Sequence, residues 1–309
     1  MIDPRPPASG ACAGAVVIPA HNEESVIART LDGLLPLLSS SEVDVIVVCN
    51  GCTDRTADVA RRYAGVTVLE TPIGSKPGAM NLGDGATKRW PRLYLDADIH
   101  VEASAVEAVF RELSRPDAPL ASRPSSIVDT RAASFPVRSY YRARARIPEQ
   151  GTRLWGAGLY AVSKEGHLRF AGFPEVTADD SWFDGLFAEG EKTIVKTVPA
   201  RVQAPRTTAA LLQILSRHRR GYVELATTDP GSQGRGRALL GTIRGVPSAL
   251  DALCYSALAA AARLQSRKMV GNGTQQWEKD SSTRSPEAAS PSTLPERASR
   301  PAHRTAAAR

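Results

Sequence analysis

Leu93-Tyr94-Leu95-Asp96-Ala97-Asp98 is the stretch of sequence that decides the fold. A short apolar run, typical of a buried β-strand, ends there in two carboxylates placed two residues apart. Side chains two apart on a strand share a face, and open α/β sheets bind ligands beyond their strand ends. Because close carboxylates repel unless a cation lies between them, we predict an Mg²⁺ or Mn²⁺ site at Asp96 and Asp98 that holds a diphosphate. A strand that ends in a solvated acidic turn is the alternative.

Apolar runs alternate with helical patterns upstream of this strand. The expected strands cover residues 15–18, 43–49 and 66–69. The expected helices cover about residues 22–38, with Asn22 as the N-cap, 53–63 and 77–88. This β-α-β-α-β-α-β order predicts an α/β fold with a right-handed, doubly wound and mostly parallel sheet.

The composition limits the partners that the chain can have. Its 309 residues carry a net charge of +7, which suits an anionic partner. Aromatic residues make up only 6%, and no basic cluster forms a recognisable nucleic-acid module, so we expect no nucleic-acid binding. Residues 1–13 resemble a disordered lead rather than a signal peptide, and the four cysteines do not suggest a disulfide scaffold. These features favour a cytoplasmic location.

The loop after the first strand reads Pro19-Ala20-His21-Asn22-Glu23. A dinucleotide-binding fold would have G-x-G-x-x-G at this position, and the P-loop pattern G-x-x-x-x-G-K-[ST] does not occur in the chain. A nucleotide site in this chain would therefore depend on a metal ion rather than on a glycine-rich cradle.

Four motifs in order resemble those of the family 2 glycosyltransferases, which are inverting enzymes of GT-A fold. They are VVIPAHNEE at 16–24, VVCNGCTDRTADVA at 47–60, GSKPGAMNLG at 74–83 and YLDADIHV at 94–101. The resemblance, which covers roughly residues 14–225, implies transfer of a hexose from a nucleotide diphosphate sugar, UDP-hexose in the first instance. The acceptor would be a saccharide or lipid of the cell envelope.

The resemblance also implies roles for residues in the first half. Pro19, Ala20, Asn22 and Glu23 would line the nucleoside, and Asn50 would contact the base. Lys76 would join the donor site, and Asp96 and Asp98 would hold the diphosphate through Mg²⁺ or Mn²⁺. The family usually has acids where this chain has Cys49 and Asn50. Because an amide both donates and accepts hydrogen bonds, the identity of the base stays open.

The second half resembles the acceptor side of the same family. The sequence VTADDSWF at 176–183 resembles its Glu-Asp motif, which implies that Asp180 is the catalytic base; a carboxylate at a helix start is also an ordinary cap. Arg217 and Arg220 resemble, more loosely, a segment that closes over the diphosphate. Since they lie three residues apart, a helix would place them on one face. The alternative to a phosphate contact is that they form a solvated basic helix end.

The resemblance ends near residue 235, which gives a catalytic domain over 14–235. Residues 236–275 are expected to form a helical extension interrupted at Pro247, and 276–309 to be a disordered tail. The extension is too short and too weakly apolar for a membrane span. Its apolar stripe packs on the catalytic domain or lies in a membrane interface. The arginines at 138, 142 and 146 form a solvated helix face or contact anionic lipid, at the inner face of the plasma membrane.

Two other functions fit part of these patterns. A sugar-phosphate nucleotidyltransferase also has an α/β nucleotide domain with acidic metal ligands, but it would need a glycine-rich basic loop after the first strand. A non-catalytic nucleotide-sugar-binding module would not need Asp96, Asp98 and Asp180 together.

Overall fold

The computed structural model describes residues 13–148, 151–224 and 235–269. The predicted lead and tail therefore lie outside the described residues, apart from residue 13. One mixed sheet has the strand order β3-β2-β1-β4-β6-β5-β7. Its strands are β1 (Gly14–Ala20), β2 (Val43–Asn50), β3 (Val66–Thr71), β4 (Arg92–Leu95), β5 (Ala121–Asp129), β6 (Leu159–Val162) and β7 (Lys192–Gln203).

The four predicted strands are parallel neighbours in this sheet, as expected. β1 pairs in parallel with β2 and β4, and β2 pairs in parallel with β3. β6 is antiparallel to both β4 and β5, and β5 is parallel to β7. The prediction of a doubly wound, mostly parallel α/β sheet is therefore confirmed, and β4 ends at Leu95, directly before Asp96.

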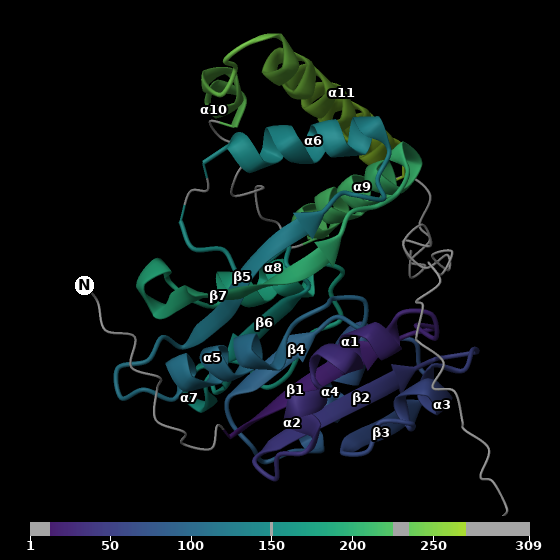
Figure 1. Cartoon of the computed structure of the whole chain (residues 1–309), viewed down its shortest axis with the longest axis vertical. Helices are drawn as coiled ribbons and strands as arrows, with labels where there is room; N and C mark the ends of the chain where they lie inside the picture. The colour runs from purple at the N-terminus through teal and green to yellow at the C-terminus, as the bar shows by residue number, and fades with distance from the viewer. Residues whose placement is uncertain (1–12, 149–150, 225–234, 270–309) are drawn as a thin grey trace, which may run out of the picture.

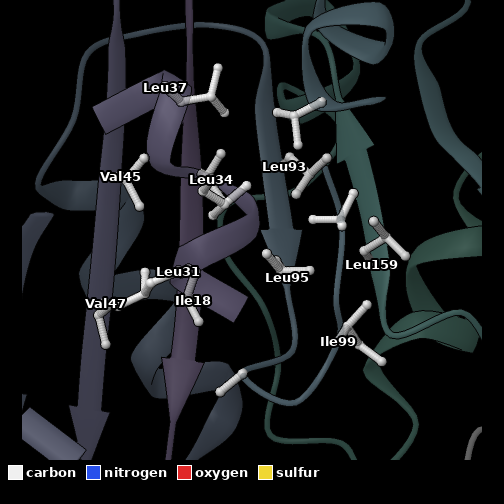
Figure 2. Close-up of a cluster of buried hydrophobic side chains, with 14 of the residues drawn as sticks. Ile18, Leu31, Leu34, Leu37, Val45, Val47, Leu93, Leu95, Ile99 and Leu159 are labelled. Atoms are coloured by element: carbon white, nitrogen blue, oxygen red, sulfur yellow. The ribbon is translucent and has the colours of Figure 1, made fainter. Parts of the chain in front are cut away.

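Helices cover both faces of the sheet. Residues along each strand alternate between these faces, so the apolar side chains form one core on each side. One core packs strand residues such as Ile18, Val47 and Leu95 against helices on the first face, as Figure 2 shows. These helices are α1 (Ile27–Gly33), α2 (Leu35–Leu38), α3 (Thr56–Ala60) and α5 (Ala103–Leu113). On the other face, α4 (Lys76–Gly85) and α8 (Asp179–Gly185) contribute Met80 and Phe183 to an aromatic-rich core. The short α7 (Lys164–His167) and a 3₁₀ turn at Glu189–Glu191 connect the remaining strands.

Several expected helix boundaries are wrong, and two of them show why. Asn22 does not cap α1, which begins at Ile27 after Val26 and has no side-chain cap. Asn22 instead adopts a positive φ of 51° in the loop before the helix, a conformation that Asn tolerates better than most residues. α3 also ends at Ala60, earlier than residue 63, because the chain turns there toward β3.

A second layer of helices lies beyond the β5–β7 side of the sheet (Figure 1). It comprises α6 (Phe135–Arg146), α9 (Thr208–Glu224), α10 (Arg235–Gly241) and α11 (Val246–Met269). α11 packs against α6 and α9 through a core that includes Tyr140, Leu211 and Leu258. The helical path is interrupted between α10 and α11, and Pro247 lies in the first turn of α11. Among the described residues, no helix is both long and apolar enough to cross a membrane.

The predicted basic face of α6 is partly paired with α11. Arg142 Nη2 lies 2.7 Å from Asp251 Oδ1, and Arg146 Nη1 lies 2.9 Å from Asp251 Oδ2. Ser139 Oγ donates to the same carboxylate at 2.5 Å. Two of the three aligned arginines therefore fasten α6 to α11, although all three stay exposed.

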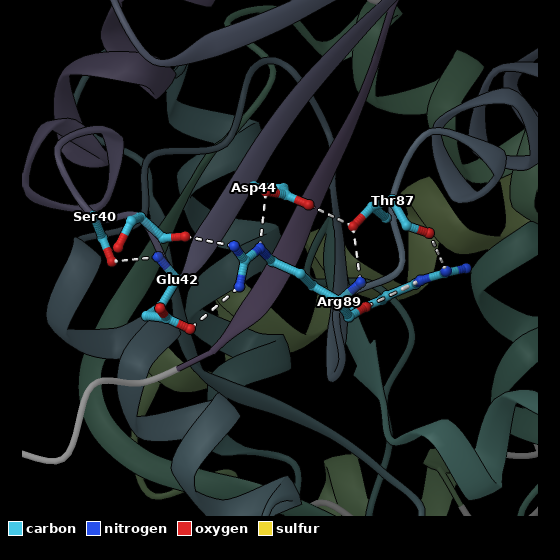
Figure 3. Close-up of polar contacts among 7 residues, drawn as sticks. Ser40, Glu42, Asp44, Thr87 and Arg89 are labelled. Carbon is cyan, nitrogen blue, oxygen red and sulfur yellow. Dashed lines mark hydrogen bonds and ion pairs between the residues drawn. The ribbon is translucent and has the colours of Figure 1, made fainter.

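A polar network closes the start of β2, at the opposite end of that strand from Asn50. Arg89 Nε donates to Asp44 Oδ1 at 3.0 Å and its Nη1 reaches Glu42 Oε2 at 3.2 Å (Figure 3). Thr87 Oγ1 donates to Asp44 Oδ2 at 2.6 Å. This network joins the α4–β4 connection to β2 and lies away from the ends of the strands that carry the predicted site.

Candidate active site at the carboxyl ends of β1 and β4

The acidic pair follows β4 in a loop that is held on both sides. The backbone N–H of Asp96 donates to the carbonyl of Gly158 at 2.8 Å. From α1, Thr30 Oγ1 donates to the carbonyl of Ala97 at 2.7 Å and Arg29 Nη2 donates to that of Asp98 at 2.9 Å. The loop that carries both carboxylates is thus fixed by backbone contacts that do not use the carboxylates themselves.

Gly158 makes this close approach possible. Its φ of +68° lies in the left-handed region, which favours glycine. A Cβ at this position would lie 2.6 Å from Ile99 Cγ1 and 3.2 Å from Asp96 Oδ2. The glycine therefore lets the backbone before β6 pass directly beside the Asp96 carboxylate.

Lys76 joins the acidic pair to the start of α8. Its Nζ lies 2.7 Å from Asp96 Oδ1 and 3.0 Å from Asp179 Oδ2. Lys76 is the first residue of α4, whose N-cap Ser75 accepts a hydrogen bond from Gly78 N at 2.9 Å. Burial disfavours the ammonium, but the carboxylates of Asp179 and Asp96 outweigh it and raise the pKa of Lys76 well above its usual value. Lys76 is therefore a permanent cation inside this site.

The Asp96 side chain lies among the same neighbours and is partly exposed. Burial raises the pKa of Asp96 to about 6. The charge of Lys76 opposes this shift, while the carboxylates of Asp179 and Asp98 add to it. A divalent cation or a bound diphosphate would therefore meet an Asp96 carboxylate that already pairs with Lys76.

Asp179 and Asp180 open α8 with different surroundings. Asp179 is 6% exposed, and its Oδ2 accepts a hydrogen bond from the hydroxyl of Tyr160 at 2.8 Å in addition to the Lys76 contact. Burial, with the charge of Asp179, raises the pKa of Tyr160 well above its usual value. The Asp179 carboxylate is thus bound by the side chains of Lys76 and Tyr160, and the neutral Tyr160 hydroxyl donates a hydrogen bond to it.

Both oxygens of the Asp180 carboxylate accept hydrogen bonds from backbone N–H groups. Its Oδ2 accepts from Gly156 N at 2.8 Å, and its Oδ1 accepts from Ser181 N at 2.7 Å. Its charge contributes to the raised pKa values of both Lys76 and Tyr160, so it lies within electrostatic reach of the group around Asp96. The structure thus gathers Lys76, Asp96 and both α8 acids in one place.

The loop after β1 lies at the same edge of the sheet. Pro19 and Ala20 end β1 and are buried. The Oδ1 of Asn22 accepts from Thr53 N at 2.6 Å, and Glu23, which is 7% exposed, has its backbone N–H bonded to Thr56 Oγ1 at 2.7 Å. The β1 loop and the β2 loop are therefore fastened to each other.

Asn50 lies beneath these loops rather than at their surface. Its side chain is fully buried, and its Nδ2 donates to the carbonyl of Ala20 at 2.9 Å. Its Oδ1 is buried without a hydrogen-bond partner within the part of the chain that the structure describes. An amide oxygen in this state can still accept an N–H donor. The base-contacting role of Asn50 stays a prediction.

The C-x-x-C pair lies between the same two loops. Cys52 Sγ accepts from Asn22 N at 3.3 Å and donates to the carbonyl of Ala20 at 3.4 Å. A hydrogen bond from Cys49 lowers the pKa of Cys52 to about 6, whereas that bond and burial raise the pKa of Cys49 well above its usual value. Both are free cysteines, and their contacts make them part of the loop structure.

The family model described as Glycosyl transferase family 2 matches residues 15–161, which include β1 to β4, the acidic pair and most of β6. Just under half of the chain is thus similar to glycosyltransferase family 2. The solved mannosyltransferase PcManGT from Pyrobaculum calidifontis superposes with a TM-score of 0.53 and 18% sequence identity, covering 84% of this chain and 75% of that one. This likeness shows that the family 2 region belongs to a GT-A fold that extends through most of the chain.

A curated relative matches at greater sequence similarity but over a smaller share of its length. The glycosyltransferase AglD of Haloferax volcanii is 26% identical over 196 residues, which make up 58% of this chain and 31% of that protein. This chain thus spans less than a third of that relative.

The family 2 match ends before α9, where the structure places the two predicted arginines. Gly221 of α9 packs against Ala178, the residue before Asp179; a Cβ on Gly221 would lie 2.5 Å from the Ala178 Cβ. The part of α9 that carries Arg217 and Arg220 therefore lies beside the start of α8. Both arginines are partly exposed.

The side chains at this site fit a divalent cation whose remaining ligands come from the substrate. Across the residues that the structure describes, no three His, Cys, Asp or Glu side chains converge to hold a metal by themselves. Mg²⁺ is usually bound by one or two carboxylates together with substrate phosphates. Asp96 and Asp98 provide two carboxylates of this kind, so the residues present fit an ion that arrives with a diphosphate.

Several contributors were missed in the sequence. Tyr160 lies within β6, and Thr30 lies within α1. His21, whose Nδ1 lies 2.5 Å from the carbonyl oxygen of Asn50, is placed between the β1 and β2 loops. None of these carries a local sequence signal, since each acts through a residue 19 to 67 positions away.

Proposed function

We propose that this chain catalyses an inverting transfer of a sugar from a nucleotide diphosphate sugar to a hydroxyl group of a saccharide or lipid acceptor. The observation that carries the proposal is the meeting of Asp96, Lys76 and the two α8 acids at the carboxyl end of β4. The similarity of residues 15–161 to glycosyltransferase family 2 supports glycosyl transfer as the reaction class.

Asp180 would act as the general base. Each of its carboxylate oxygens accepts one backbone N–H, which orients the carboxylate and leaves further lone pairs for an acceptor hydroxyl. As the acceptor oxygen forms its bond to the anomeric carbon, its proton passes to Asp180. The bond from the anomeric carbon to the phosphate oxygen breaks on the opposite face, and the nucleoside diphosphate leaves with the electron pair. General-base assistance of this kind typically contributes about 10²–10⁴-fold.

Asp96 and Asp98 would hold Mg²⁺ or Mn²⁺ together with the diphosphate, and the ion would supply charge neutralisation for the leaving group. Lys76 keeps Asp96 oriented, and Arg217 and Arg220 are the proposed phosphate contacts from α9. The mannosyltransferase of similar fold is described in complex with GDP-Man and Mn²⁺, which supports a nucleotide sugar and a divalent ion here.

The proposed donor is a UDP-hexose, with Pro19, Ala20, Asn22, Glu23 and Asn50 forming the nucleoside end of the site. Guanine is the alternative base, since the amide of Asn50 can both donate and accept. The proposed location is the cytoplasm with peripheral contact at the inner face of a membrane. The free thiols of Cys49, Cys52 and Cys254 support a reducing compartment.

A donor screen tests this function. The full chain is heated with UDP-glucose, UDP-galactose or GDP-mannose in the presence of Mn²⁺ or EDTA, and bound donor raises the melting temperature by mass action. We expect one donor to stabilise the protein with Mn²⁺ and not with EDTA, and slow release of nucleoside diphosphate in its presence. Release of pyrophosphate from a nucleoside triphosphate and a sugar phosphate would instead indicate a nucleotidyltransferase. Donor binding with no turnover under any condition would indicate a binding module.

A further inference from the structure

α11 carries apolar residues on two opposite faces. Its inner face contributes Ala252, Tyr255, Leu258 and Ala262 to the core with α6 and α9. A second row, spaced four and three residues apart, follows the outer face and falls within an arc of about 80° at 100° per residue. Its members are Val246, Leu250, Leu253, Ala257, Ala260 and Leu264.

The large members of this outer row are strongly exposed. Val246 is 74% exposed, Leu250 55%, Leu253 66% and Leu264 61%. Leu240 of α10, at 68%, lies on the adjoining helix. Contiguous apolar surface of this kind is uncommon on a soluble monomer and usually marks an interaction surface. We name this row, with Leu240, the outer stripe of α10–α11.

The charges around the outer stripe have one sign. Residues 235–269 contain six Arg or Lys residues and a single acid, Asp251. That acid is not part of the outer surface, because its side chain is 3% exposed and is paired with Arg142 and Arg146 of α6. Arg237 and Arg244 precede the stripe and Arg263 lies near its other end; all three are exposed. The stripe therefore has a basic border.

We infer that the outer stripe of α10–α11 docks on the anionic surface of a lipid bilayer. An apolar helix face bordered by basic residues is the pattern of a helix that lies in the plane of the membrane interface. Each basic residue near an anionic membrane adds to the attraction. A second copy of the chain fits less well, because it would bring two basic borders together.

The outer stripe is connected to the candidate active site through α9. Ser216 Oγ of α9 lies 3.4 Å from the Ala262 carbonyl of α11, and Gly221 of the same helix packs against Ala178 beside the α8 acids. Docking through α11 would therefore hold the acceptor side of the molecule one helix away from the lipid surface. This inference deepens the proposed peripheral location, on which it rests, and requires no particular donor or reaction.

Flotation of the full chain with vesicles tests the inference. Vesicles of phosphatidylcholine alone are compared with vesicles that contain one part phosphatidylglycerol to three parts phosphatidylcholine, each at 50 mM and 500 mM NaCl. We expect binding to the anionic vesicles that weakens at high salt. The double substitution Leu250→Asp and Leu253→Asp should reduce the bound fraction at least about 10-fold, since it removes two apolar contacts and adds repulsion.

Leu168→Asp is the matched control, because Leu168 is 80% exposed and lies outside the α10–α11 layer. It should leave vesicle binding unchanged. If the double variant does not fold, Arg237→Glu with Arg244→Glu provides an independent test and should also weaken binding to anionic vesicles.

Three results would overturn the inference. They are absence of wild-type binding to anionic vesicles, equal binding by the wild type and the folded double variant, and a wild-type dimer, measured by light scattering, that the double variant dissociates. The last result would assign the stripe to a second copy of the chain. Failure of the proposed glycosyl transfer would appear in the donor screen and would leave the vesicle result unaffected.

Discussion

Asp179 and Asp180 are adjacent residues with different partners, and this difference divides their roles. Asp179 faces inward to Tyr160 and Lys76, whereas Asp180 is held by the backbone N–H groups of Gly156 and Ser181. Asp179 is suited to fixing the position of Lys76, and Asp180 is suited to receiving a proton from a bound group. The residues around the site therefore act mainly through the partners that they hold in place.

Lys76 links these partners, so its removal should affect both folding and activity. Lys76→Met would leave Asp96 and the buried Asp179 without their shared cation. We expect the free energy of unfolding to fall by about 1–3 kcal/mol, since a buried carboxylate loses a charged hydrogen bond. Urea denaturation measures this loss. Arg89→Ala, in the network of Figure 3 away from the site, is the control and should lower stability by about 1 kcal/mol or less without loss of turnover. Equal turnover by Lys76→Met and the wild type would contradict the linking role.

Gly158 and Gly156 offer a matched pair of substitutions. Both have positive φ, but a Cβ on Gly158 would press on Ile99 and approach Asp96, whereas nothing lies within 4 Å of a Cβ on Gly156. Both alanine variants should lose about 1 kcal/mol of stability to backbone strain. Only Gly158→Ala should also weaken Mn²⁺-dependent nucleotide binding, measured by calorimetry. Equal effects of the two substitutions on binding would show that the approach of Gly158 to Asp96 does not matter.

At the scale of elements, Asp251 fastens α11 to α6. Hydrogen bonding from Arg142, helped by Ser139 and Arg146 against the effect of burial, lowers the pKa of Asp251 from 3.8 to about 2. A lowered pKa means that the folded protein favours the carboxylate. Its stabilising contribution is therefore complete well above pH 4 and is lost as the pH falls toward 2.

Asp251→Asn removes this pH-dependent contribution. We expect the variant to be less stable than the wild type by about 2 kcal/mol at pH 6 and by about 1 kcal/mol at pH 3. Urea unfolding at the two pH values measures the difference. A gap between the two proteins that does not change with pH would mean that the ion pairs to Arg142 and Arg146 do not hold α6 and α11 together.

The elements of the first half could be predicted from sequence because their signals are local. The apolar run before Asp96 and the nearly continuous apolar strand at 43–49 gave both the strands and the edge of the sheet where the acids meet. The Lys76 bridge could not be predicted in the same way, since it joins residues about 20 and 100 positions apart. Asn22 was assigned to a helix cap because its type favours caps, but the loop contacts with Thr53 and Cys52 hold it in another conformation.

At the scale of the whole molecule, the site lies where the sheet meets the helical layer of α6, α9 and α11. The donor half is built from β1, β2 and β4, while α8 and α9 bring the acids and arginines of the other half. Figure 1 shows α10 and α11 at the end of the molecule far from β2 and β3. Sequence alone predicted the apolar pattern of α11, but not that only its inner half is used for packing.

Metal removal should act on the whole donor complex rather than on the fold. Lys76 pairs with the Asp96 carboxylate, and the loop that carries both acids is held through its backbone, so EDTA should leave the melting temperature of the free protein unchanged. The same treatment should abolish the stabilisation that a nucleoside diphosphate gives with Mn²⁺. Thermal unfolding with and without nucleotide separates the two effects, and destabilisation of the free protein by EDTA would indicate a structural metal instead.

In the proposed mechanism, Asp180 activates the acceptor while Asp96 and Asp98 hold the donor diphosphate. The most direct measurement compares Asp180→Asn with the wild type in both donor binding and turnover. We expect the affinity of the variant for nucleoside diphosphate with Mn²⁺ to stay within about 3-fold of the wild-type value, while its turnover falls by at least about 10²-fold. A variant that loses its nucleotide affinity, or one that keeps its turnover, would contradict this mechanism.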